Sequence, residues 1–186
     1  MKTVLFGTIM LVHLLFLLGC QQSTTLTEEN LHVKKDWEGF AEPESSDWVK
    51  YIMPVREYMY YRTQAVVNKD IQLLWDKYPD LKENWDRKQG VNVEQFEVES
   101  LNDSFNLLDA NYNIESYERI KVKIISDQEV IILVHGSIVY LRNDFDESGG
   151  EYLMKLYLEY KDNHWTIVKT DEYTEPEYKE WLKKRL

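Results

Sequence analysis

Four segments in the C-terminal half constrain the fold of this chain more than any other feature of the sequence. They cover residues 119–124, 130–141, 152–160 and 165–170. Three of them alternate apolar and polar residues with a period of two, whereas the second is apolar on both faces, as a central strand should be. The short sequences SDQ and KDN between neighbours predict tight turns. The pattern therefore predicts a curved antiparallel meander of four or more strands.

Helical patterns precede this sheet. Ser46 or Asp47 can cap a helix whose apolar positions over 55–66 fall on one face, with Arg62 contributing its aliphatic stem. Because proline cannot donate a backbone hydrogen bond, Pro54 is expected to limit the start of this helix to about Val55, or to lie in its first turn.

The segment between this helix and the sheet carries weaker patterns. Asp70 can cap a short second helix that ends at Pro79. We expect a helix over 81–90, a short strand over 94–100 and a helix over 101–112. After the sheet, Thr174 and Glu177 form a capping box for a final helix with Tyr178, Trp181 and Leu182 as its apolar stripe. The sequence predicts an α+β domain over 47–186.

The N-terminal segment has the layout of an export signal. Lys2 supplies positive charge and residues 4–18 are almost uninterruptedly apolar, shorter than the roughly 18 residues expected of a spanning helix. Cys20, the only cysteine in the chain, follows at once. Residues 20–46 are polar and lack sustained periodicity, which predicts a flexible tether.

The sequence Leu17, Leu18, Gly19, Cys20 resembles the lipobox of bacterial lipoproteins. The resemblance implies that residues 1–19 are a signal peptide, that the Cys20 sulfur carries a diacylglyceryl group, and that cleavage makes Cys20 the first mature residue. It also implies anchorage to the extracytoplasmic face of a cell membrane. Several acyl chains are needed because one chain gives only marginal binding.

Composition excludes several function classes. With its one cysteine in the predicted anchor, the folded region has no disulfide, thiol nucleophile or sulfur ligand for zinc. The net charge of −11 disfavours a nucleic-acid partner, because an acidic surface repels phosphates. The sequence contains no dinucleotide fingerprint, phosphate loop or HExxH motif. We therefore expect no cofactor.

The order of elements resembles the nuclear transport factor two-like superfamily. The resemblance rests on NKD after the first helix, LLWDKYP at the end of the second, and HWTIVKTDEY as last strand, and it spans about 55–173. It implies a curved sheet that wraps the first helices into a cone with a pocket at its open end. Some members are isomerases, dehydratases or hydrolases, and others only bind or assemble. A cystatin-like sheet-and-helix fold is the alternative.

Two candidate chemical sites are weighed against structural roles. In DFDESGGEY, Asp144, Asp146, Ser148 and Gly149 match positions of a calcium loop, but Lys155 stands where the bidentate glutamate should be. We expect an acidic hairpin and no metal site. His135, in a strand, is expected to be a hydrogen-bonded structural residue, because no nucleophile elbow accompanies it. No catalytic residue is assigned.

The aromatic residues allow two interpretations. In the first, a pocket in the cone is lined by Tyr58, Trp75, Tyr140 and Trp165, with the Asp171 carboxylate as a polar group beside them. In the second, the same aromatic side chains only fill the core. The leading hypothesis is a non-enzymatic, membrane-anchored lipoprotein that binds a small ligand or an envelope protein. The alternative is an isomerase-like or dehydratase-like enzyme with an acidic general base, which requires an open cavity holding a carboxyl group with a perturbed pKa.

Overall fold

The computed structural model describes residues 39–104, 106–114 and 120–185. The predicted signal peptide, Cys20 and the tether up to residue 38 lie outside this range. Within it, no helix has the length and apolar character needed to cross a bilayer.

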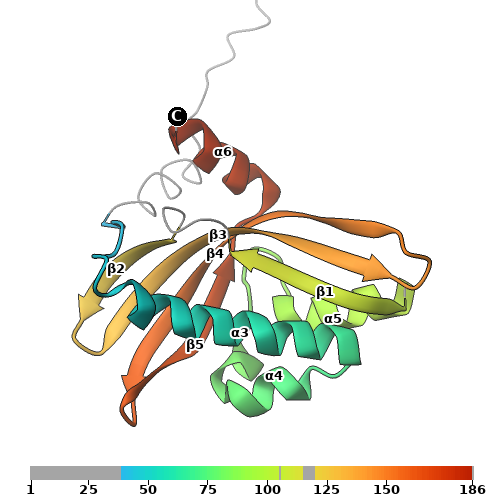
Figure 1. Ribbon diagram of the computed structural model, residues 1–186, viewed down its shortest axis with the longest axis horizontal. Coiled ribbons are helices and arrows are strands. Elements are labelled where there is room, and N and C mark those ends of the chain that lie inside the picture. The colour runs from blue at the N-terminus through green and yellow to red at the C-terminus, as the bar shows by residue number, and fades with distance from the viewer. Residues whose placement is uncertain (1–38, 105, 115–119, 186) are drawn as a thin grey trace, which may run out of the picture. The chain divides into compact units, whose positions relative to one another are not determined.

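A single antiparallel sheet of five strands organises the fold (Figure 1). The strands are β1 (Leu107–Ile114), β2 (Ile120–Ser126), β3 (Glu129–Arg142), β4 (Glu147–Lys161) and β5 (His164–Glu172). From β2 to β5 each strand pairs with the next, so the predicted meander is confirmed. β1 adds a fifth strand, which pairs with the C-terminal half of β3 while β2 pairs with its N-terminal half.

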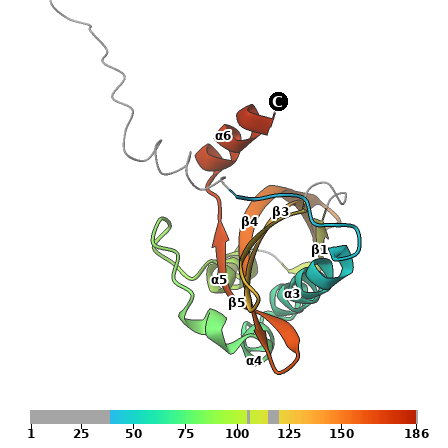
Figure 2. The same cartoon turned by 90° about the vertical axis from the view of Figure 1, so that its left-hand side faces the viewer.

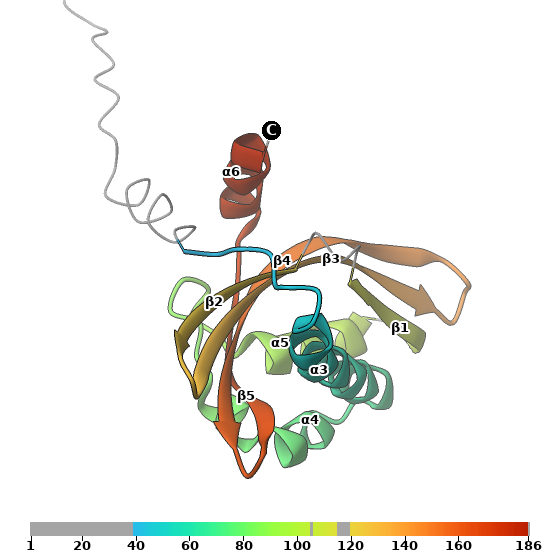
Figure 3. The same ribbon diagram turned by 60° about the vertical axis from the view of Figure 1, so that its left-hand side comes forward.

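The strand register places one set of apolar side chains on the concave face. Val130, Ile132 and Val134 of β3 stand opposite residues 158, 156 and 154 of β4, and all six side chains are buried in the core. The tight turn between β4 and β5 uses Asp162 and Asn163, both with positive φ, as the right-handed strand twist favours. Figures 2 and 3 show the sheet curving over the helices.

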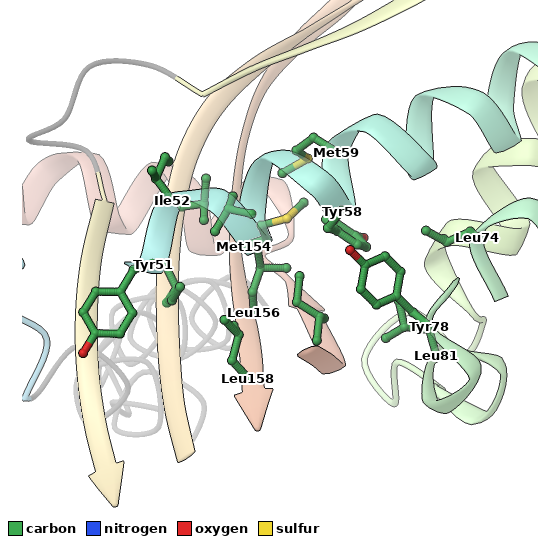
Figure 4. Close-up of a cluster of buried hydrophobic side chains, with 14 of the residues drawn as sticks. Tyr51, Ile52, Tyr58, Met59, Leu74, Tyr78, Leu81, Met154, Leu156 and Leu158 are labelled. Carbon is green, nitrogen blue, oxygen red and sulfur yellow. The ribbon is translucent and has the colours of Figure 1, made fainter. Parts of the chain in front are cut away.

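Helix α3 (Trp48–Asn68) lies along the concave face and supplies the other half of the core. Its buried positions recur at helical spacing, and Tyr58 is fully buried beside Tyr78, with ring centroids 5.9 Å apart (Figure 4). Lys69, in a left-handed conformation, ends the helix. Helix α4 (Gln72–Lys77) follows with Ile71, not the expected Asp70, at its N-cap position, and the Asp70 carboxylate accepts a hydrogen bond from the Gln72 N–H in the turn before the helix.

Asp47 precedes the first helix, as one of the two expected caps, but the start expected at about Val55 is wrong. The helix begins at Trp48 and Pro54 lies inside it, so the turn before Pro54 lacks one backbone hydrogen bond. Tyr51 and Ile52, in that same early segment, are only 3% and 2% exposed. Burying such side chains stabilises by about 1.5–3 kcal/mol each, which offsets the cost of the proline. Asp47 occupies the N-cap position without a side-chain capping bond.

The predictions for residues 80–112 are also wrong. A 3₁₀ helix (Pro79–Glu83) is followed by a turn. In this turn the Asp86 carboxylate accepts hydrogen bonds from the N–H groups of Lys88 and Gln89, so these groups are not used in the hydrogen bonds of a helix. The expected strand 94–100 belongs to helix α5 (Val93–Ser104). Half of the expected helix 101–112 is strand β1 (residues 107–112), because pairing with β3 outweighs the local helical spacing, whereas residues 101–104 are helical and end α5.

The convex face carries the C-terminal helix α6 (Glu175–Arg185). Its predicted capping box is present, because Glu177 Oε2 accepts a hydrogen bond from the Thr174 N–H at 2.8 Å. Tyr178 and Trp181 pack against His135, whose side chain points away from the core of the cone.

Backbone pairing reaches upstream of position 47, where the domain is expected to begin. Ala41 forms two hydrogen bonds with Val122 of β2, at 2.9 Å and 2.7 Å. The Phe40 ring also lies under the Lys123 ammonium, 6.0 Å from the ring centroid. Residues just before 47 therefore belong to the sheet edge.

Gly136 provides a test of the close approach between β1, β3 and β4. A Cβ at this position would lie 2.2 Å from the Asn113 carbonyl oxygen and 2.5 Å from the Tyr152 hydroxyl. We expect Gly136→Ala to lower the free energy of unfolding by about 1–3 kcal/mol, measured by urea denaturation. Gly150→Ala, where the added methyl group meets nothing within 4 Å, is the matched control. Equal effects of the two substitutions would contradict this packing.

Candidate functional site

A pocket of about 250 Å³ opens at the wide end of the concave face. Six elements contribute to it: α3, α5, β1, β3, β4 and β5. Its lining residues are Arg62, Val93, Phe96, Glu97, Ser100, Leu101, Tyr112, Ile138, Tyr140, Tyr152, Met154 and Glu172. A larger hollow of about 620 Å³ lies outside the cone, between residues 80–88 and the edge of β5. The smaller pocket is the candidate site, because the charged side chains of Arg62, Glu97 and Glu172 line it directly.

Arg62 is the centre of that network. Its side chain is 5% exposed and projects from α3 one turn after Tyr58. Arg62 Nε donates to Glu97 Oε2 of α5 at 2.7 Å, and Nη1 donates to Glu172 Oε1 of β5. Nη1 also donates to the Tyr58 hydroxyl at 3.2 Å. One guanidinium therefore joins three separate elements of the fold.

Two tyrosine hydroxyls supply the remaining hydrogen bonds to the Glu97 carboxylate. Tyr112 of β1 and Tyr140 of β3 both donate to Glu97 Oε1. Burial is the main cause that raises the pKa of both phenols, and the neighbouring Glu97 charge raises it further. Both hydroxyls therefore stay protonated as donors, and both oxygens of Glu97 are occupied.

A second buried carboxylate lies behind the pocket wall. Glu94 is 1% exposed, and its Oε1 accepts hydrogen bonds from the Tyr58 hydroxyl at 3.0 Å and from Thr170. Asn84 in turn donates to Thr170 Oγ1 at 2.7 Å. Glu94 Oε2 is buried and has no hydrogen-bond partner among the residues that the structure describes.

Glu172 is the carboxyl group that meets the open pocket, with 19% of its side chain exposed. Burial raises the pKa of Glu172, Arg62 opposes that rise, and the negative charges of Glu97 and Glu94 add to it. Arg62 is the one donor to Glu172 Oε1 in the described part of the chain, and Oε2 has none there. The pocket therefore presents an available acceptor oxygen that can also take up a proton.

The sequence identified only part of this site. Tyr140 lines the pocket as one hypothesis expected, whereas Tyr58 is core and contacts the network from behind. Trp165 packs against Tyr51 and Tyr160, and Trp75 lies beside Lys82, so neither belongs to the pocket. Asp171 projects to the convex face, where its carboxylate contacts Lys155 and Lys88.

The glutamates Glu94 and Glu97 were missed because their segment was predicted to be a strand. The signal that could have found them is Asn92, whose Oδ1 accepts a hydrogen bond from the Gln95 N–H at 3.0 Å. An asparagine followed three residues later by a glutamine is a helix-start pattern, and a helix puts Glu94 and Glu97 on one face.

The two other candidates from the sequence lie away from the pocket. His135 is 1% exposed, and its Nε2 lies 3.0 Å from the Tyr178 hydroxyl, in a structural position beneath α6. Asp144, at the β3–β4 hairpin, accepts hydrogen bonds from the Arg142 side chain and the Asp146 N–H. Across residues 39–104, 106–114 and 120–185, no three His, Cys, Asp or Glu side chains are placed to hold a metal ion.

No protein-family model and no curated protein sequence matches the chain. Solved structures do. Aln2 from a Streptomyces species matches with a TM-score of 0.54 at 7% identity, over 76% of this chain and 99% of Aln2. A nuclear transport factor 2-like superfamily protein from Salmonella enterica serovar Typhimurium matches with a TM-score of 0.47 at 9% identity, over 69% and 92% of the two chains.

A protein of unknown function with a cystatin-like fold, from Nostoc punctiforme, has a TM-score of 0.47 at 10% identity over 73% of this chain and 96% of its own. At such identities the likeness concerns the fold alone. The expected α+β class is confirmed: helices, a curled antiparallel sheet and a short C-terminal helix form a fold that Aln2 shares.

Removing the central cation tests the network. Arg62→Met keeps the stem but leaves Glu97 and Glu172 without their counter-ion, so we expect the free energy of unfolding to fall by about 3–5 kcal/mol in urea denaturation. Lys77→Met is the matched control, because it breaks the half-exposed Lys77–Glu57 pair, worth at most about 1 kcal/mol. A loss below about 1 kcal/mol in Arg62→Met would show that the network does not support the fold.

Proposed function

We propose that this chain is a lipid-anchored, extracytoplasmic protein whose cone pocket binds a small ligand without transforming it. The proposal rests on one observation: most polar groups of the pocket already make hydrogen bonds within the protein. The hydroxyls of Tyr112 and Tyr140 and the Nε and Nη1 donors of Arg62 are already committed to glutamates, while a hollow with aromatic walls remains open beside them.

This arrangement favours recognition over catalysis. General acid–base chemistry on a carbonyl substrate needs a donor that can turn to the developing oxyanion. The hydroxyls of Tyr112 and Tyr140 are held by Glu97, so a substrate would have to displace an internal hydrogen bond to use either of them. A hollow of about 250 Å³ is close to the lower end of ligand pockets, which fits a small molecule.

The anchor is supported by the N-terminal sequence. A positively charged start, an apolar run and the unique Cys20 after Gly19 fit a lipidated cysteine. The acidic domain brings no polybasic patch to the bilayer, so attachment falls to the acyl chains. Such attachment would hold the pocket outside the cell, where a ligand can reach it.

Occluding the pocket tests ligand binding. Ser100, on α5, lines the pocket, and we expect Ser100→Trp to abolish binding of any fragment that the purified full chain captures from a mixed set of cationic, neutral and anionic small molecules. Ligand-observed NMR measures this. Glu99→Trp, on the exposed side of the same helix, is the matched control and should bind normally. Absence of any fragment whose binding depends on residue 100 would refute the pocket function.

Metabolic labelling tests the anchor separately. Cells grown with a radioactive fatty acid should label the wild-type chain and leave Cys20→Ala unlabelled, because the thiol is the acceptor of the lipid. Both forms are followed in parallel by immunoblotting of membrane and soluble fractions. Label that persists in Cys20→Ala would end the lipoprotein hypothesis.

A second function is favoured by one observation: Glu172 is a carboxyl group with a raised pKa that lines an open cavity. Glu172 could act as the general base of an isomerase-like or dehydratase-like reaction. A small β,γ-unsaturated ketone in D₂O distinguishes the two functions. Deuterium incorporation that the chain catalyses and that Glu172→Gln abolishes would establish the enzyme, whereas unchanged ketone supports binding alone.

A further inference from the structure

We propose that the ligand of the cone pocket is a small organic cation, such as a quaternary or primary amine, held between Glu172 and the tyrosine rings. The inference rests on the proposed binding function of the same pocket and adds the class of ligand.

The charges around the pocket are unbalanced. Glu94, Glu97 and Glu172 lie on one connected network, and Arg62 is the cation that this network contains. Three carboxyl groups against one guanidinium leave an excess of negative charge in a poorly solvated place, where charges interact more strongly than in water. An incoming cation would reduce this excess, whereas an anion would increase it.

Arg62 offers little to an anion. Its Nε donates to Glu97 and its Nη1 to Glu172 and Tyr58, which leaves Nη2 as the one guanidinium nitrogen without a hydrogen-bond partner in the described residues, and only 5% of the side chain is exposed. A ligand carboxylate or phosphate that reached Nη2 would lie close to Glu97 and Glu172, whose negative charges repel it.

Glu172 offers the contact that a cation needs. Its Oε1 accepts from Arg62, and its Oε2, without a donor in the described residues, belongs to a side chain that lines the pocket. The raised pKa of Glu172 reflects burial and neighbouring negative charge, and a bound cation would stabilise its ionised form.

The walls have the aromatic character that binds such cations. Tyr112 and Tyr152 meet edge to face with ring centroids 6.3 Å apart, and Tyr140 and the 55% exposed Phe96 also line the pocket. The Tyr112 ring already carries a cation, because the Arg62 guanidinium lies 5.1 Å from its centroid. Ring faces combined with a carboxylate are the usual means of holding alkylammonium groups.

Three probes of nearly the same shape test the charge. Choline, the neutral 3,3-dimethylbutan-1-ol and the anionic 3,3-dimethylbutanoate are titrated into the purified full chain by calorimetry, with Ser100→Trp reporting whether binding occurs in the pocket. We expect choline to bind at least about tenfold more tightly than the neutral alcohol, and the anion to bind most weakly. Glu172→Gln should lose about tenfold in affinity for choline while its affinity for the neutral alcohol stays unchanged.

The outcomes separate this inference from the function on which it rests. If the neutral alcohol or the anion binds as tightly as choline or more tightly, the pocket still binds ligands but the proposal that its ligand is a cation is wrong. The cation proposal is also wrong if none of the three probes binds while the fragment screen finds ligands whose binding depends on residue 100. Failure of every fragment refutes the binding function itself. A circular-dichroism spectrum and melting temperature of Glu172→Gln close to wild type ensure that lost affinity is not lost folding.

Discussion

The buried guanidinium of Arg62 is the interaction on which the rest of the structure depends. It projects from α3, contacts Glu97 on α5 and Glu172 on β5, and lies over the Tyr112 ring on β1. These elements are far apart in the sequence, and side-chain contacts join the two helices to the strands. The relative positions of the pocket walls therefore depend on one charged side chain that joins four of the six lining elements, in addition to the apolar core.

This arrangement suits the pocket to the recognition that we propose. Both oxygens of Glu97 and one oxygen of Glu172 have hydrogen-bond donors, which leaves few ways for these side chains to rearrange, so the other acceptor oxygen of Glu172 and the rings are held in place before a ligand arrives. The same fixed hydrogen bonds limit proton-transfer chemistry. Glu172 is the one carboxyl group of the pocket with a raised pKa, and together with its partial exposure this keeps the enzymatic alternative open to experiment.

The sequence predicted the strands from β2 to β5 because their alternation and their turns are local signals, and it predicted α6 because Thr174 and Glu177 form a local capping box. It failed over 80–112, where Asp86, the Asn92 cap and the long-range pairing of β1 with β3 decide the structure. Half of the site was hidden by that failure. From the sequence, Arg62 was expected only to pack its aliphatic stem on the apolar face of its helix. The carboxylates that pair with its guanidinium become its neighbours only in the folded structure.

The bridge between Ala41 and Val122 would have a mechanical consequence if the domain is tied to a membrane as we propose. Among the described residues it is the first backbone pairing along the chain, so its two hydrogen bonds at the rim of β2 would bear a pull from the N-terminal side before the sheet itself does. β2 pairs with the first half of β3, whereas the pocket residues Ile138 and Tyr140 belong to its second half. Under tension the bridge to β2 can therefore open while the C-terminal half of β3, which carries the pocket residues, keeps its structure.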